Sequence, residues 1–213
     1  MVVSVNMYQT YILKNGLKVI HQQIAGKAAW CGLIIGVGSR DEQPEEEGIA
    51  HFIEHVIFKG TEKRKAYHIL SRIEDVGGEL NAYTTKEDTC IYASFLPTDY
   101  ERVLELFADI VFNSIFPEKE IEKEKEVVLD EINSYKDSPG ELIFDDFEEL
   151  IYRGYPIGRN ILGSEEAVKG LNRDSILKFV KRNYSPSKMV ISSIGYFSFE
   201  KLVKLVECYF GEI

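Results

Sequence analysis

The chain has 213 residues, of which 45% are apolar and 28% charged, and its formal net charge is −10. These values are typical of a globular protein with a sizeable core, and they exclude disordered, collagen-like and membrane-bundle classes. The negative charge argues against a nucleic-acid partner, because phosphate binding needs a basic surface. No apolar run approaches the roughly 18 residues of a membrane span, so we expect no membrane insertion.

Cysteine usage and the first residues of the chain predict a cytoplasmic location. Cys31, Cys90 and Cys208 are odd in number and far apart, so neither a disulfide framework nor a CxxC metal knuckle is expected. Residues 1–7 have neither the basic flank nor the apolar stretch of a secretory signal. Reduced thiols in the cytoplasm are the simplest interpretation.

Strands are expected mainly in the first half of the chain. The Asn15-Gly16 dipeptide predicts a hairpin between the first two strands, and a second hairpin follows further on. The stretches rich in β-branched and aromatic residues are 8–13, 17–22, 29–37, 80–85, 89–96 and, isolated near the end, 189–194.

Helices are expected where apolar residues recur with a period near 3.6. One helix begins near Gly48 and ends before Gly60, and another is closed by the glycines at 77 and 78. Thr98 and Asn172 are expected to cap two later helices, and a last helix begins at Ser198. After the helix that begins near Gly48, the predicted helices cover 66–76, 98–112, 117–135, 139–152, 172–183 and 198–209.

This order of elements predicts an α+β fold, in which a mixed or antiparallel sheet packs against helices. Strands occur in adjacent groups and do not alternate strictly with helices. The sequence has no internal repeat and no Pro/Ser-rich linker, so we expect a single domain over residues 1–213.

The most informative motif is His51-Phe-Ile-Glu54-His55, which lies within the first predicted helix. At about 100° per residue, His55 lies about 40° from His51 around the helix axis, and Glu54 about 60° to the other side. Both imidazoles can therefore reach one metal ion, and Zn²⁺ is bound well by neutral imidazole. Glu54 would then serve as the general base of a zinc hydrolase.

The spacing leaves two questions open. Two histidines on a helix with Phe and Ile between them could also be packing residues. A catalytic zinc site takes a third protein ligand, which the motif does not contain. His21 and His68 are isolated and better explained as structural residues. The acidic stretch at 120–131 offers several carboxylates, and periodicity alone does not choose among them.

The motif and its surroundings closely resemble the zinc site of the pitrilysin family, the inverzincin metallopeptidases that include insulin-degrading enzyme and the mitochondrial processing peptidase. The resemblance spans nearly the whole chain, with the motifs in family order. They are Gly38-Ser-Arg-Asp-Glu42, Gly48-Ile-Ala-His51-Phe-Ile-Glu54-His55-Val-Ile-Phe-Lys59-Gly60-Thr61, Gly77-Gly-Glu-Leu-Asn81-Ala82-Tyr-Thr84, Glu124-Lys-Glu-Val-Val-Leu-Asp-Glu131-Ile132, Tyr155-Pro-Ile-Gly158-Arg159-Asn-Ile-Leu-Gly163 and Tyr209-Phe-Gly211.

The resemblance implies roles that the spacing could not assign. It makes Glu131 the third zinc ligand, beside His51 and His55. It makes Glu124 a second acidic residue of the active site, which orients a ligand or a substrate group from outside the metal shell. Asn81 and Ala82 match the strand edge on which family members bind extended peptide by strand addition.

Length distinguishes this chain from the family pattern. The smaller members consist of two similar halves, and only the first half carries the zinc motif. We therefore expect a peptide substrate and a second homologous domain or subunit that completes the active site. The chain is either one part of a longer polypeptide or a subunit paired with a separate chain, and its activity alone stays open.

The predicted function is a zinc metalloendopeptidase that acts on extended or unfolded peptides. The main alternative is a non-catalytic structural or assembly subunit on the same fold. Such relatives commonly lose zinc-site residues, whereas this sequence keeps His51, Glu54, His55 and Glu131. A zinc ion that only stabilises the fold would need a fourth protein ligand, and no nearby Cys or His is evident to supply one.

Overall fold

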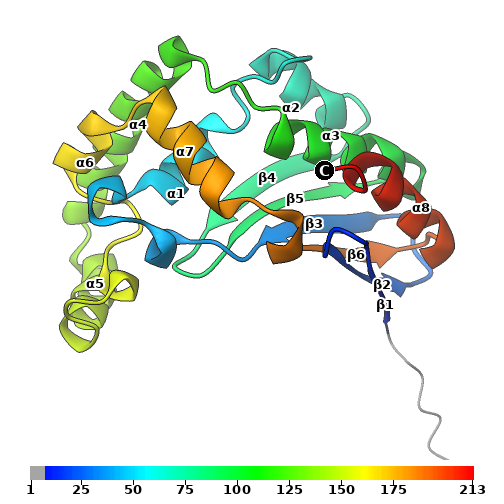
Figure 1. The fold of residues 1–213 in the computed structure, drawn as a ribbon, viewed down its shortest axis with the longest axis horizontal. Helices are drawn as coiled ribbons and strands as arrows, with labels where there is room; N and C mark the ends of the chain where they lie inside the picture. The colour runs from blue at the N-terminus through cyan, green and yellow to red at the C-terminus, as the bar shows by residue number, and fades with distance from the viewer. Residues whose placement is uncertain (1–7) are drawn as a thin grey trace, which may run out of the picture.

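The computed structural model describes residues 8–213, which form one six-stranded sheet and eight α-helices (Figure 1). Residues 1–7, in which the sequence predicts no secretory signal, lie outside the described residues. In chain order the elements are β1 (Gln9–Ile12), β2 (Lys18–Gln23), β3 (Ala29–Ile35), α1 (Ile49–Val56), α2 (Ala66–Glu74), β4 (Glu79–Thr84), β5 (Thr89–Phe95), α3 (Tyr100–Phe112), α4 (Glu118–Lys136), α5 (Pro139–Ile151), α6 (Glu165–Gly170), α7 (Arg173–Asn183), β6 (Met189–Gly195) and α8 (Phe199–Phe210).

The sheet is mixed, as predicted, with strand order β1-β2-β6-β3-β5-β4. Both predicted hairpins are present, β1 with β2 and β4 with β5. The strand expected to be isolated, β6, pairs in parallel with β2 and antiparallel with β3, and so joins the two hairpins into one sheet. At the far end, β4 is an edge strand that pairs only with β5 among the described residues.

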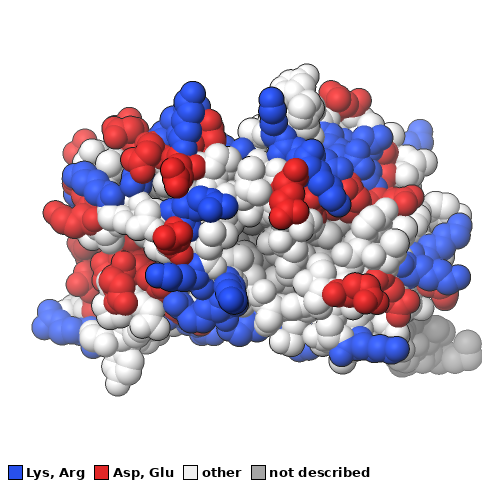
Figure 2. All heavy atoms as spheres, turned by 45° about the horizontal axis from the view of Figure 1, so that its top comes forward, with Lys and Arg blue, Asp and Glu red and all other residues white. Residues whose placement is uncertain are grey.

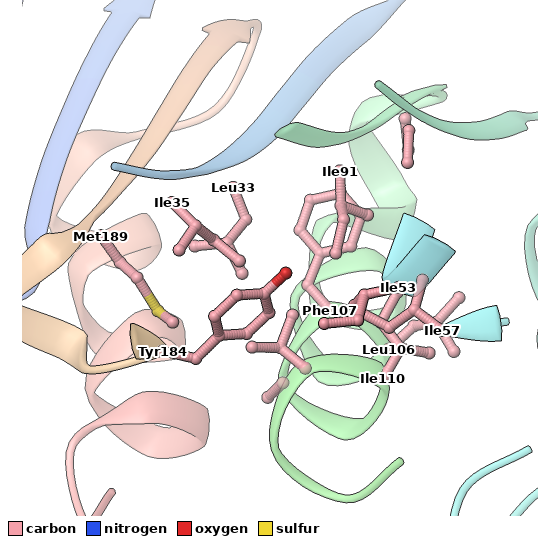
Figure 3. Close-up of a cluster of buried hydrophobic side chains, with 14 of the residues drawn as sticks. Leu33, Ile35, Ile53, Ile57, Ile91, Leu106, Phe107, Ile110, Tyr184 and Met189 are labelled. Carbon is pink, nitrogen blue, oxygen red and sulfur yellow. The ribbon is translucent and has the colours of Figure 1, made fainter. Parts of the chain in front are cut away.

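One face of the sheet builds the core. Along β3 and β6 buried side chains alternate with partly exposed ones, as expected when helices cover a single face. Figure 3 shows Tyr184 among apolar side chains from three directions. Its labelled neighbours come from the sheet, from α1 with the residue that follows it, and from α3: Leu33, Ile35, Ile91, Met189, Ile53, Ile57, Leu106, Phe107 and Ile110. This core fixes the position of α1 against the sheet.

The structure corrects two local predictions. Thr98 does not cap α3: Pro97 begins a 3₁₀ turn that delays the helix to Tyr100, and the Thr98 hydroxyl instead donates to the Asp99 carboxylate at 3.0 Å. Helix α6 was not predicted, because its six residues are too few for a periodic pattern. Its cap is Ser164, whose hydroxyl accepts a hydrogen bond from the Ala167 N–H.

Membrane-spanning potential, cysteine state and surface charge were each predicted from the sequence and can be compared with the structure. Within residues 8–213, no helix is both long enough and apolar enough to cross a membrane. Cys31 and Cys90 are buried free thiols, and Cys208 is an exposed one. On the face in Figure 2, acidic and basic side chains are interspersed and do not gather into one basic patch.

Candidate metal centre

The orientation of helix α1 is set by its apolar residues, which pack into the core and leave the motif residues on another side of the helix. Ile49, Phe52, Ile53 and Val56 are fully buried, and they fix the rotation of the helix. His51, Glu54 and His55 consequently share the side that faces α4 and β4. His51 is itself 8% exposed, so its imidazole is almost completely removed from water.

Glu131 lies with the two histidines, as the family resemblance implied. The Nε2 atoms of His51 and His55 are 3.3 Å apart, and the Glu131 Oε2 lies 3.7 Å from the first and 3.4 Å from the second. Tetrahedral zinc with ligands at about 2.1 Å holds neighbouring donors about 3.4 Å apart. The donor types and spacing therefore fit one Zn²⁺ ion without rearrangement, and the three residues form one group able to hold a metal.

Helix α4 brings Glu131 to this position through its packing. Ile121, Val128 and Ile132 form a buried stripe on α4 at helical spacing. Glu124 lies within the same stripe and has a side chain only 12% exposed, whereas the Glu131 side chain is 43% exposed. Docking of the stripe places both carboxylates beside α1.

Glu124 orients His55 from outside the group of three donors. Its Oε2 lies 3.4 Å from the Nδ1 of His55, on the side of the ring away from Glu131. Its Oε1 forms an ion pair with the Lys59 ammonium at 2.7 Å. A carboxylate behind an imidazole ring fixes its tautomer and its orientation. No role was assigned from the sequence to Lys59, which lies three residues beyond the end of α1.

Burial tunes the charges of the site. Burial, helped by the neighbouring His55, lowers the pKa of His51 to about 4, so its imidazole is neutral at neutral pH and can act as a metal ligand. Burial also raises the pKa of the Glu54 carboxyl above its usual value. Glu131 adds to this rise and His55 opposes it, so Glu54 belongs to the same electrostatic cluster. A raised pKa makes Glu54 a stronger base than an exposed carboxylate.

Asn81 and Ala82 lie on β4, the edge strand that packs beside α1. Their side chains point to opposite faces: Ala82 is 8% exposed and faces the helices, while Asn81 is exposed. The strand edge is therefore placed next to the metal centre. Binding of a peptide to this edge stays a prediction.

The two other histidines are outside the site. His21 is fully buried, with Nδ1 3.1 Å from the Ser193 hydroxyl and Nε2 2.9 Å from the Phe197 carbonyl oxygen, and is a core histidine. His68 lies on the exposed side of α2. Both agree with the expected structural roles.

Family comparison identifies the class of protein. Residues 18–165 match the family model "Insulinase (Peptidase family M16)", and residues 170–213 match "Peptidase M16 inactive domain". The first match covers more than half of the chain. The chain therefore belongs to the M16 peptidase family, the insulinase and pitrilysin group that its motifs resemble.

Relatives support this assignment and the zinc cofactor. The zinc protease YmxG of Bacillus subtilis, itself named as uncharacterized, is 38% identical over 206 residues, which cover 96% of this chain and 50% of that protein. The probable mitochondrial-processing peptidase subunit beta of Arabidopsis thaliana is also 38% identical, over 94% of this chain and 38% of its own length.

Solved structures have the same fold. The crystal structure of a protease from Helicobacter pylori superposes with a TM-score of 0.91 at 26% identity, covering 96% of this chain and 50% of that one. Pitrilysin has a TM-score of 0.87 at 22% identity, which shows the fold alone. The chain thus spans about half or less of the length of these relatives.

Proposed function

We propose that this chain is the zinc-binding part of an endopeptidase that hydrolyses extended or unfolded peptides. The observation that carries this proposal is the group formed by His51, His55 and Glu131, whose donor atoms are 3.3 to 3.7 Å apart. These residues would hold the Zn²⁺ ion, and the names of the relatives as zinc proteases support that choice of metal.

Each residue of the site has a distinct part in the proposed reaction. When bound, zinc supplies a Lewis acid that polarises the scissile carbonyl and lowers the pKa of a coordinated water to about 7. Glu54 accepts a proton from the attacking water and returns it to the leaving amine nitrogen. Glu124, paired with Lys59, keeps the His55 ring in orientation.

The substrate is proposed to lie along β4 at Asn81 and Ala82. A peptide that adds a strand to this edge would gain main-chain hydrogen bonds, which give affinity without demanding a particular sequence. An extended or unfolded segment is the only form of substrate that can pair in this way. The edge is open among the described residues and lies beside the metal centre.

A second M16-type half, covalent or separate, is proposed to complete the site. Two apolar surfaces of the chain support this partner. The outer face of the sheet exposes Trp30, Tyr83 and Tyr92, and helix α5 exposes Phe144 and Phe147. Apolar patches of this kind usually mark an interaction surface. The free thiols favour the cytoplasm as the proposed location.

The test separates metal binding from chemistry. Glu54→Gln should leave zinc content unchanged and lower cleavage of a quenched peptide by about 10²-fold or more, because only the base is lost. Zinc is measured by atomic spectroscopy, and cleavage with and without an added second half. Glu122→Gln, on the exposed side of α4, is the matched control and should behave as wild type.

Two results would decide against the proposal. Unchanged turnover in Glu54→Gln would remove this residue from the mechanism. A wild-type chain that binds zinc but cleaves nothing, even when a second half is present, would favour the structural-subunit alternative.

A further inference from the structure

Helix α1 begins at a residue that cannot cap it. The N-cap position is Gly48, which has φ +83° and no side chain to accept a hydrogen bond. A Cβ atom here would lie 2.4 Å from the carbonyl oxygen of Leu162, so a larger residue would not fit. The free N–H groups of the first turn must therefore find an acceptor elsewhere in the chain.

Glu42 supplies that acceptor from six residues upstream. Its Oε2 accepts from the Gly48 N–H at 3.0 Å, and its Oε1 accepts from the Ala50 N–H at 2.9 Å. The side chain is almost completely enclosed, since the residue is only 4% exposed. Burial raises the pKa of this carboxyl to about 8, and the hydrogen bonds from the Ala50 and Gly48 N–H groups oppose that rise.

A second segment holds Glu42 in place. The Arg159 Nη1 donates to the backbone oxygen of Glu42 at 3.2 Å, and its Nε lies 3.6 Å from the carboxylate of Glu47. At Gly163 a Cβ atom would meet the backbone oxygen of Glu47 at 2.6 Å. The 159–163 segment therefore packs backbone to backbone against the start of α1.

The metal centre depends on this turn because His51 follows Ala50 directly. His55 has Glu124 behind its ring, but the buried Nδ1 of His51 has no hydrogen-bond partner among residues 8–213. The position of the His51 ring is consequently set by its backbone and by packing. Movement of the first turn would carry the His51 Nε2 away from its neighbours.

We propose that Glu42, anchored by Arg159, is a positioning residue of the metal centre. It fixes the first turn of α1 and so keeps the His51 Nε2 3.3 Å from the His55 Nε2. This inference rests on the proposed zinc site.

The test is the zinc affinity of two variants of the 213-residue chain, measured by competition with a chromophoric chelator. Glu42→Ala removes both acceptor oxygens and should weaken zinc binding by about 10- to 100-fold, the effect typical of groups that orient metal ligands. Glu42→Gln keeps one acceptor oxygen and should give a smaller loss. The visible spectrum of the Co²⁺-loaded chain, which reports ligand geometry, should change in the same order.

Ser198→Ala is the matched control. It removes the cap of α8, where the Ser198 hydroxyl accepts from the Lys201 N–H, and should destabilise the chain without changing zinc affinity or the Co²⁺ spectrum. If Glu42→Ala does not fold, Glu42→Gln decides. Wild-type zinc affinity and an unaltered Co²⁺ spectrum in the Glu42 variants would make Glu42 a plain helix cap and overturn the inference. Absence of zinc binding by the wild type would instead overturn the zinc site itself, and this inference with it.

Discussion

Helices α1 and α5 use their amphipathic faces in opposite ways. In α1 every apolar side chain is buried, and the motif residues gather on the remaining side. In α5 no residue is buried, and the apolar side chains of Ile143, Phe144, Phe147, Leu150 and Ile151 are all more than half exposed. Figure 1 shows α5 projecting away from the sheet at the lower left, whereas α1 lies close to it.

The inward side of α5 is polar. Asp145 accepts hydrogen bonds from the Tyr135 hydroxyl at 2.6 Å and the Asn160 amide at 2.9 Å, and Lys86 pairs with both Asp145 and Glu148. A helix whose polar side faces the protein and whose apolar side faces water has an exposed apolar surface of the kind that binds a partner. The contrast is that α1 buries its apolar side within this chain, whereas α5 leaves an apolar side exposed, which is consistent with the proposed second half binding there.

The largest expected effect is on zinc affinity, and it tests whether the metal centre on α1 needs a residue that is distant in sequence. Glu131→Ala removes one of three donors and should weaken zinc binding by about 100-fold or more, a larger loss than that of a residue acting from outside the metal shell. Removal of zinc from the wild type with a chelator should leave the same fold by circular dichroism.

Glu122→Ala, also on α4, is the control and should bind zinc normally. Equal affinity in the two variants would exclude Glu131 from the site.

The second prediction compares the two helices directly. Ile53→Ala in α1 leaves a cavity in the core and should lower the free energy of unfolding by about 2–5 kcal/mol. Phe147→Ala in α5 should change it by less than about 0.5 kcal/mol, because Phe147 is already 59% exposed. Urea denaturation of the chain alone measures both.

A large loss in Phe147→Ala would show that α5 has a packed environment in solution. With a second half present, we expect the same substitution to weaken its binding.

The smallest effect concerns the polar contacts of α5. Lys86→Met removes ion pairs with partly exposed carboxylates, which are worth about 0–1 kcal/mol. Global stability should therefore hardly change. Hydrogen exchange should nevertheless become several-fold faster in α5 and stay constant in α1, because the carboxylates that pair with Lys86 belong to α5. Faster exchange in both helices would mean that they move as one unit.

Much of this architecture could be predicted from the sequence because its signals are local. The Asn15-Gly16 turn, the helix of the HxxEH motif and the strand β4 follow from short patterns, whereas the edge position of β4 was implied by the family resemblance. The α+β class and the family assignment are confirmed by the mixed sheet and the M16 match.

What the sequence could not supply depends on contacts between distant segments. Periodicity left several carboxylates on α4 equivalent, and the family resemblance alone selected Glu131. The physical reason lies in the docking of Ile121, Val128 and Ile132, which places Glu131 beside α1. The role of Glu42 was missed for the same reason. A glycine at the start of a metal-binding helix, with an acidic residue shortly before it, is the signal that could have revealed it.

The place of β6 has a consequence for synthesis on the ribosome. Among the described residues, the β1–β2 hairpin meets the rest of the sheet only through β6, which is synthesised long after β2. Until residues 189–195 emerge from the exit tunnel, the β1–β2 hairpin and the strands β3, β5 and β4 lack the strand between them, so the facing edges of β2 and β3 are unpaired. Such edges invite pairing with other polypeptides, and β6 covers both of them when it adds to the sheet.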